Sequence, residues 1–413
     1  MAEDKTPPLA SMVRAGDKQT EAEAITPFIF MAHDVSNAYL VTTDDGDVMV
    51  NTGFNANADR NVALFKPHRT GPLRYIILTQ SHADHFGGVP EFTEQRTKLV
   101  GGPDFNEMLG DMMGMQAFFG PRTAKLWGTT LAQGGPPKPQ PHPVPDILVD
   151  ERLTLEVGNR TFELISAPEG ETIDNILVWM PREKIVFTGN TFGPVWLSMP
   201  FLNTLRGDKP RLVRNYLKAL RKVRDLNAEL LITGHGEPIR GAQRIRDDLD
   251  RMEAAVTFVR DYTLSGMKAG KDVHTLVREF AFPDNLAIGD FHGKASWAVR
   301  SIWQEYAGWF HYEDGTTALY GVPQKAVHAD IAEMAGGAEK LAERAQAHAD
   351  AGRPLEALHL TQIALNADPA NRSALMAKKT ATAALLEAAG GKNLSETMWL
   401  RSELAEIDKL LGS

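Results

Sequence analysis

The sequence predicts an α/β sandwich of two sheets covered by helices, followed by an all-α helical domain. Two observations support this prediction. From residue 25 to residue 240, short β-rich runs alternate with polar turns and single helical segments. Beyond Ile239 the β-rich runs stop, and apolar residues recur with the 3.6-residue period of helices.

Each half of the predicted sandwich contains several strands and one helix. In the first half, we expect strands at 28–31, 37–42, 47–50 and 73–79, with a helix near 61–65. In the second half, we expect strands at 153–155, 162–165, 176–179, 185–187 and 230–232, with a helix at 211–225.

Composition divides the chain further. Residues 1–24 are polar and predict a weakly structured N-terminal arm, and residues 25–240 are the expected α/β domain, with an insertion rich in Met, Phe and Gly at 91–145. Residues 241–413 are the expected helical domain, whose Ala-rich tail resembles one tetratricopeptide-like hairpin. A single hairpin cannot bury its own apolar face, so it must pack on something else.

Length and composition exclude several classes of protein. The 413 residues predict two or three domains. No apolar run approaches the roughly 18 residues of a membrane span, and the N-terminus lacks a secretory signal, so we expect a cytoplasmic protein. The absence of cysteine excludes thiolate metal sites. The net charge of -9 argues against nucleic acid and anionic membranes as partners.

Three metal-competent side chains lie within four residues where the predicted strand at 73–79 ends. His82, Asp84 and His85 follow Gln80, and the two glycines after them allow a tight backbone turn. Imidazole and carboxylate groups suit zinc and similar divalent ions. The alternative is a polar surface loop that happens to hold two histidines.

Three further candidates end strands in the second half of the chain. Glu171, Asn190 and His235 each follow a β-rich run and lie at a turn. With Gln80, this arrangement resembles the metallo-β-lactamase superfamily, whose motif is His-x-His-x-Asp-His with later ligands after a Pro-Gly turn, in a Thr-Gly-Asp segment and in a final Gly-His.

Other segments resemble the alkylsulfatase group within that superfamily, including its helical dimerisation domain. They include Thr204–Gly207, Tyr306–Phe310 and Ala367–Asn371, and the resemblance covers roughly residues 25–410. It implies a homodimer and a first metal site of Gln80, His82 and Glu171. It also implies a second site of Asp84, His85 and His235, with position 190 between the two. The sterol-carrier-like domain that often follows in alkylsulfatases is expected to be absent.

Two positions depart from the family pattern. Gln80 replaces a histidine, and Asn190 stands where alkylsulfatases place a bridging carboxylate. Gln80 weakens the first site, and Asn190 removes the carboxylate that would bridge the two metal ions. We therefore expect the site of Asp84, His85 and His235 to fill more readily. The expected cofactor is one or two zinc ions, with manganese or iron as alternatives. A decayed site that is kept only for its fold is the competing interpretation.

The predicted chemistry is hydrolysis. A divalent ion lowers the pKa of bound water toward roughly 7 and so creates hydroxide at neutral pH. Asp84, His82 and His85 are the expected catalytic residues. Arg206 is the candidate contact for an anionic group of the substrate, assisted by Asn203, although a structural ion pair explains an arginine there equally well.

Three functions are compatible with these sequence features. The first is hydrolysis of a sulfate ester, on an anionic or amphiphilic small molecule. The second is hydrolysis of a carboxylic ester, a lactone or a β-lactam on the same scaffold. The third is a non-catalytic binding protein with a degenerate metal site.

Overall fold

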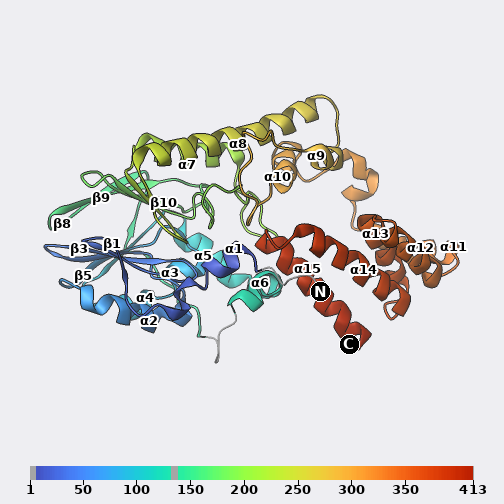
Figure 1. The fold of residues 1–413 in the computed structure, drawn as a ribbon, viewed down its shortest axis with the longest axis horizontal. Coiled ribbons are helices and arrows are strands. Elements are labelled where there is room, and N and C mark those ends of the chain that lie inside the picture. Colours follow the sequence, from blue (N-terminus) through green and yellow to red (C-terminus); the bar gives the residue numbers. More distant parts are fainter. Residues whose placement is uncertain (1–5, 132–137, 413) are drawn as a thin grey trace. The chain divides into compact units, whose positions relative to one another are not determined.

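The computed structural model describes residues 6–131 and 138–412 and has the predicted α/β sandwich followed by helices (Figure 1). Residues 1–5 of the predicted arm and 132–137 of the predicted insertion lie outside the described residues. The described chain divides into two compact units. One holds residues 8–124 and 128–303, and the other holds mainly residues 304–413.

The first sheet has seven strands in sequence order. Its first four strands are antiparallel, and the next three pair in parallel. The strands are β1 Glu23–Thr26, β2 Ile29–Ala32, β3 Ala38–Thr43, β4 Gly46–Val50, β5 Leu73–Ile77, β6 Lys98–Gly101 and β7 Ile147–Leu148.

The second sheet has six strands, in the order β13-β12-β11-β10-β9-β8. Only β11 and β12 pair in parallel, so their carboxyl ends meet at one edge of this sheet. The strands are β8 Arg152–Val157, β9 Arg160–Ser166, β10 Ile176–Met180, β11 Ile185–Gly189, β12 Leu230–Thr233 and β13 Ile239–Arg240.

The core of the sandwich lies between the two sheets. Both inner faces contribute fully or nearly fully buried apolar side chains, among them Val41 and Ile77 from the first sheet and Val178, Phe187 and Ile232 from the second. Most of these residues are β-branched or aromatic, which suits a pleated surface that is buried on one face. This core fixes the loops at the strand ends relative to one another.

Helices cover the outer faces of the two sheets (Figure 1). The helices α2 Ala58–Phe65, α3 Ala83–Phe86, α4 Val89–Phe92 and α5 Phe105–Gly114 contribute to an apolar cluster with the outer face of the first sheet. The helices α7 Val213–Asp225 and α8 Ala242–Lys268 lie against the second sheet, and α6 Gln116–Leu131, α9 Val273–Glu279 and α10 Ala295–Ala307 complete this part of the chain.

The described part of the N-terminal arm is more regular than its polar composition predicted. Helix α1 spans Pro8–Met12, and strand β1 joins the first sheet. Leu9 and Val13 are buried, because their spacing of four residues places both side chains on one face of a helical turn.

The second compact unit is helical. Its helices are α11 His328–Met334, α12 Ala338–Asp350, α13 Pro354–Ala367, α14 Arg372–Ala389 and α15 Leu394–Leu411. Small side chains from three of these helices form a buried cluster, with Ala345 from α12, Ala357 from α13, and Ala377 and Ala381 from α14. Helices α12 and α13 therefore bury their shared apolar face against α14. No helix in the described ranges is both long and apolar enough to cross a membrane.

Candidate metal centre

The sequence-predicted ligands meet where strands of both sheets end. Gln80 and His82 follow β5, and Asp84 and His85 lie in the short helix α3 directly after them. The second sheet contributes three loops, in which Glu171 follows β9, Asn190 follows β11 and His235 follows β12.

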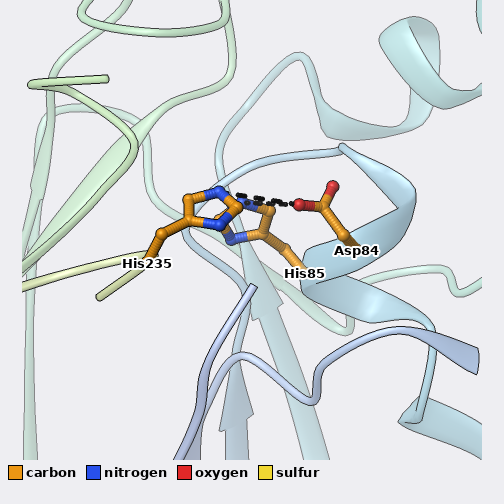
Figure 2. Close-up of side chains that lie close together, drawn as sticks. All are labelled: Asp84, His85 and His235. Atoms are coloured by element: carbon orange, nitrogen blue, oxygen red, sulfur yellow. Dashed lines mark ion pairs between the residues drawn. The ribbon is translucent and has the colours of Figure 1, made fainter. Parts of the chain in front are cut away.

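Asp84, His85 and His235 form the tightest group. One potential ligand atom from each lies within 4.8 Å of the others, and Figure 2 shows both imidazoles directed at the Asp84 carboxylate. The Nε2 atoms of His85 and His235 each lie 3.8 Å from Oδ2 of Asp84. These three side chains come from α3 and from the loop after β12, so the packing of the two sheets brings them together.

The tautomer of His85 follows from its neighbours. The Ser36 hydroxyl donates its one hydrogen to the carbonyl oxygen of Gly234 at 2.9 Å, so it accepts from Nδ1–H of His85 at 3.2 Å. Nε2 of His85 therefore carries a lone pair, and it is buried without a hydrogen-bond partner among the described residues. Burial lowers the pKa of His85 to about 3, so the imidazole is neutral and free to bind a cation near neutral pH.

Residues in β3 and just before it hold the loop that carries His235. The backbone N–H of Asn37 donates to the carbonyl oxygen of Gly234 at 2.7 Å, and the Asn37 side chain donates to that of Gly236 at 2.8 Å. The Tyr39 hydroxyl donates to the carbonyl oxygen of Thr233 at 2.8 Å. Ser36 contacts His85, while Asn37 and Tyr39 hold the loop of His235, so one segment of the first sheet positions both histidines. Sequence reasoning missed Ser36 and Asn37, because neither belongs to a motif of metal ligands.

The other predicted ligands form a second group. Gln80 Nε2 lies 2.7 Å from Nδ1 of His82, and Glu171 Oε1 lies 3.9 Å from the same Nδ1. The backbone N–H of Asn190 donates to Oε1 of Gln80 at 3.0 Å. The buried Oδ1 of Asn190 has no hydrogen-bond partner among the described residues.

The loop between β11 and α7 covers this second group. Arg206 lies in it with a side chain that is about one-fifth exposed, and its NH2 nitrogen is 3.1 Å from Nε2 of His82. Asp208 and Arg211, which sequence reasoning did not single out, are also in contact with the group. Asn203 is exposed, and within the described ranges no hydrogen bond or ion pair joins it to the other predicted site residues.

A methyl group at Gly234 should weaken metal binding. A Cβ there would lie 2.1 Å from Oδ1 of Asn190 and 3.0 Å from Cε1 of His85, so both side chains must move. We expect Gly234→Ala to lower zinc affinity by roughly 10- to 100-fold, as changes to groups that support metal ligands typically do. Calorimetric titration of the metal-free protein measures this. The control Gly110→Ala introduces a Cβ that meets no atom within 4 Å, and an equal loss in both variants would contradict the prediction.

The sandwich, with candidate ligands at the strand ends, has the architecture of a metallo-β-lactamase domain. Residues 32–235 match the model of the metallo-beta-lactamase superfamily, and residues 273–403 match that of alkyl sulfatase dimerisation. The chain thus combines a metallo-β-lactamase domain with an alkyl sulfatase dimerisation domain, which confirms the predicted resemblance and fold class.

Individual relatives agree with this assignment. The chain is 24% identical over 340 residues to a linear primary-alkylsulfatase of a Pseudomonas species, covering 73% of this chain and 61% of that protein. It is 24% identical over 372 residues to the alkyl/aryl-sulfatase BDS1 of Saccharomyces cerevisiae, covering 83% and 56%. The chain thus spans little more than half the length of these curated relatives.

Solved structures share the fold over nearly the whole chain. The stereoselective inverting sec-alkylsulfatase Pisa1 from Pseudomonas sp. superposes with a TM-score of 0.84 at 20% identity, covering 99% of this chain and 69% of that one. The shared fold includes both the sandwich and the helices that follow it.

Proposed function

We propose that this chain is a metal-dependent hydrolase of alkyl sulfate esters. The observation that carries the proposal is the group of Asp84, His85 and His235, in which a buried, unpartnered imidazole nitrogen faces a carboxylate. This donor set fits one divalent cation, because two nitrogens and one oxygen suit zinc and leave further positions for water and substrate. When bound, such a cation would polarise the ester and activate a water molecule.

The chain's own residues have distinct roles in this proposal. Asp84 supplies the anionic ligand and is positioned to orient the attacking water, while His85 and His235 fix the position of the cation. We expect zinc in this site, with manganese or iron as alternatives, and we expect it to fill more readily than the group of Gln80, His82 and Glu171. The sulfatase names of the relatives favour a sulfate ester over a lactone, a carboxylic ester or a β-lactam.

Arg206 is the proposed contact for the sulfate group. Its buried Nε–H has no hydrogen-bond partner among the described residues, and its side chain is about one-fifth exposed beside His82. A guanidinium presents paired donors that match sulfate oxygens. The Arg206 side chain therefore places hydrogen-bond donors next to the candidate metal centre. Asn203, three residues earlier, stays a candidate for a weaker contact.

Arg206→Ala should raise the Michaelis constant for an alkyl sulfate by roughly 10- to 100-fold, because a hydrogen bond to a charged group contributes about 1.5–3 kcal/mol. Metal content should not change, since Arg206 is not a proposed ligand. Steady-state kinetics and elemental analysis measure the two effects. The control Arg214→Ala removes an exposed arginine on α7, and an unchanged Michaelis constant in Arg206→Ala would count against the assignment.

A substrate panel tests the proposed function itself. We expect the zinc-loaded protein to release inorganic sulfate from primary or secondary alkyl sulfates faster than it opens a lactone or a β-lactam or cleaves a carboxylic ester. Activity confined to those other substrates would replace the sulfatase proposal with acyl transfer on the same scaffold. Protein that binds no metal and turns over none of the substrates would favour a binding role.

Two further proposals concern the whole protein. The alkyl sulfatase dimerisation match at residues 273–403 supports a homodimer, with residues 241–413 as the dimerisation domain and residues 25–240 as the catalytic domain. Light scattering that gives the mass of one chain would refute the homodimer. We also keep the expectation of a cytoplasmic protein that acts on a small anionic or amphiphilic molecule, without nucleic acid or membrane as partner.

A further inference from the structure

The orientation of the Gln80 side chain bears on how many metal ions the site holds. A backbone N–H can be bonded only by an acceptor, so the atom that faces the N–H of Asn190 at 3.0 Å must be the amide oxygen of Gln80. The amide NH2 of Gln80 therefore points at Nδ1 of His82, 2.7 Å away. At the position where the family pattern has a histidine ligand, this chain presents a hydrogen-bond donor to the next ligand.

This contact fixes the tautomer of His82. Since Nδ1 accepts from Gln80, the proton of the neutral imidazole is on Nε2, and Nε2–H donates to Oδ2 of Asp208 at 3.2 Å. Arg206, whose NH2 nitrogen is 3.1 Å from the same Nε2 and 3.5 Å from Oδ2 of Asp208, then pairs with the carboxylate instead of the imidazole. Both nitrogens of His82 are thus engaged within the protein.

Arg211 occupies the remaining side of this group. Its NH2 nitrogen lies 2.7 Å from Oε1 of Glu171 and 3.9 Å from Oδ2 of Asp208. The guanidinium also donates to two main-chain carbonyl oxygens, from NH1 to Phe201 at 2.8 Å and from Nε to Glu171. Because main-chain atoms of two loops hold it in place, the position of this positive charge does not depend on the Glu171 carboxylate alone.

Two guanidinium groups already pair with the carboxylates of this group. Arg211 pairs with Glu171 and Asp208, and Arg206 pairs with Asp208. A divalent cation beside Gln80 would therefore be repelled by two guanidinium groups that already occupy the carboxylates it needs as ligands.

We propose that the active site is mononuclear, with one ion held by Asp84, His85 and His235, and that the guanidinium of Arg211 takes the place of the second ion beside Glu171. This inference rests on the proposed function, since it assumes that the first of these groups binds a metal. It assigns Gln80, His82 and Asp208 to a hydrogen-bonded network beside the metal site. It assigns Arg211 the role of a fixed positive charge.

Metal content tests this proposal independently of activity. The full chain is loaded with excess zinc, freed of unbound metal on a desalting column and analysed for zinc by mass spectrometry. We expect one ion per chain in the wild type, and none in His235→Gln. The ion should remain in Glu171→Gln and in Gln80→Leu. These variants alter the group of Gln80, His82 and Glu171 by different means, so either one provides the test if its counterpart does not fold.

The possible results separate the two claims. Two ions per chain in the wild type, with similar affinities, would overturn the mononuclear site and leave the proposed hydrolase intact. A single ion that is lost in Glu171→Gln or Gln80→Leu but kept in His235→Gln would overturn the assignment of the ion. No bound zinc in the wild type would overturn both this inference and the proposed function.

Discussion

Asp84→Asn should abolish both tight zinc binding and sulfate-ester hydrolysis. The substitution keeps the size of the side chain but removes the only anionic member of the group formed with His85 and His235. It leaves both imidazole nitrogens, each 3.8 Å from Oδ2 of Asp84, without a carboxylate partner. If the cation provides about 4 kcal/mol of transition-state stabilisation, its loss lowers kcat/KM by about 1,000-fold.

Zinc analysis and kinetics on the same preparation measure both losses. The matched control is Asp59→Asn, which neutralises an exposed carboxylate on α2 and should leave both quantities unchanged. Circular dichroism should show that both variants are folded. An Asp84→Asn protein that retains its zinc and full activity would show that the catalytic cation is bound elsewhere.

Arg211→Leu should destabilise the fold by roughly 3–5 kcal/mol, the cost typical of removing one partner from a buried ion pair. The side chain of Arg211 is only 3% exposed, and it pairs with Glu171 and donates to the carbonyl oxygen of Phe201. Its removal leaves a carboxylate and buried main-chain acceptors without their donors, which is costly in a poorly solvated site. Denaturant unfolding of the metal-free protein measures the change in free energy.

Arg214→Leu is the comparison for this prediction. It makes the same chemical change at an exposed position only three residues away, at the start of α7, and should alter stability by no more than about 0.5 kcal/mol. Equal unfolding free energies for the two variants would mean that Arg211 does not support the loops around Glu171.

The sandwich was predictable because its strands have clear apolar patterns and polar turns. The run at Tyr75–Leu78 is apolar, whereas residues 80–85 are polar apart from Ala83, and this abrupt change marks both the end of β5 and the candidate ligands. His235 and Asn190 were recognisable for the same reason, since each follows a strand and a glycine. Helix α1 was not predicted, because it spans only five residues within an arm that is otherwise polar.

The support of the site was not predictable from the sequence. Ser36 lies 49 residues before His85, and the bond from its hydroxyl to Gly234, which sets its role, depends on how the two sheets pack. Asp208 lies 126 residues after His82, in a loop without a strand or helix pattern. Such contacts depend on where irregular loops cross, and neither residue type nor spacing reveals that. The substitution at Gln80 was visible in the sequence, but its consequence depends on the backbone N–H of Asn190.

Anomalous diffraction from crystals of the zinc-loaded protein, recorded on both sides of the zinc absorption edge, would locate the catalytic cation. We expect one strong zinc peak per chain, within bonding distance of Asp84, His85 and His235. Those three side chains turned toward separate surfaces, with no peak among them even after soaking in zinc, would contradict this expectation.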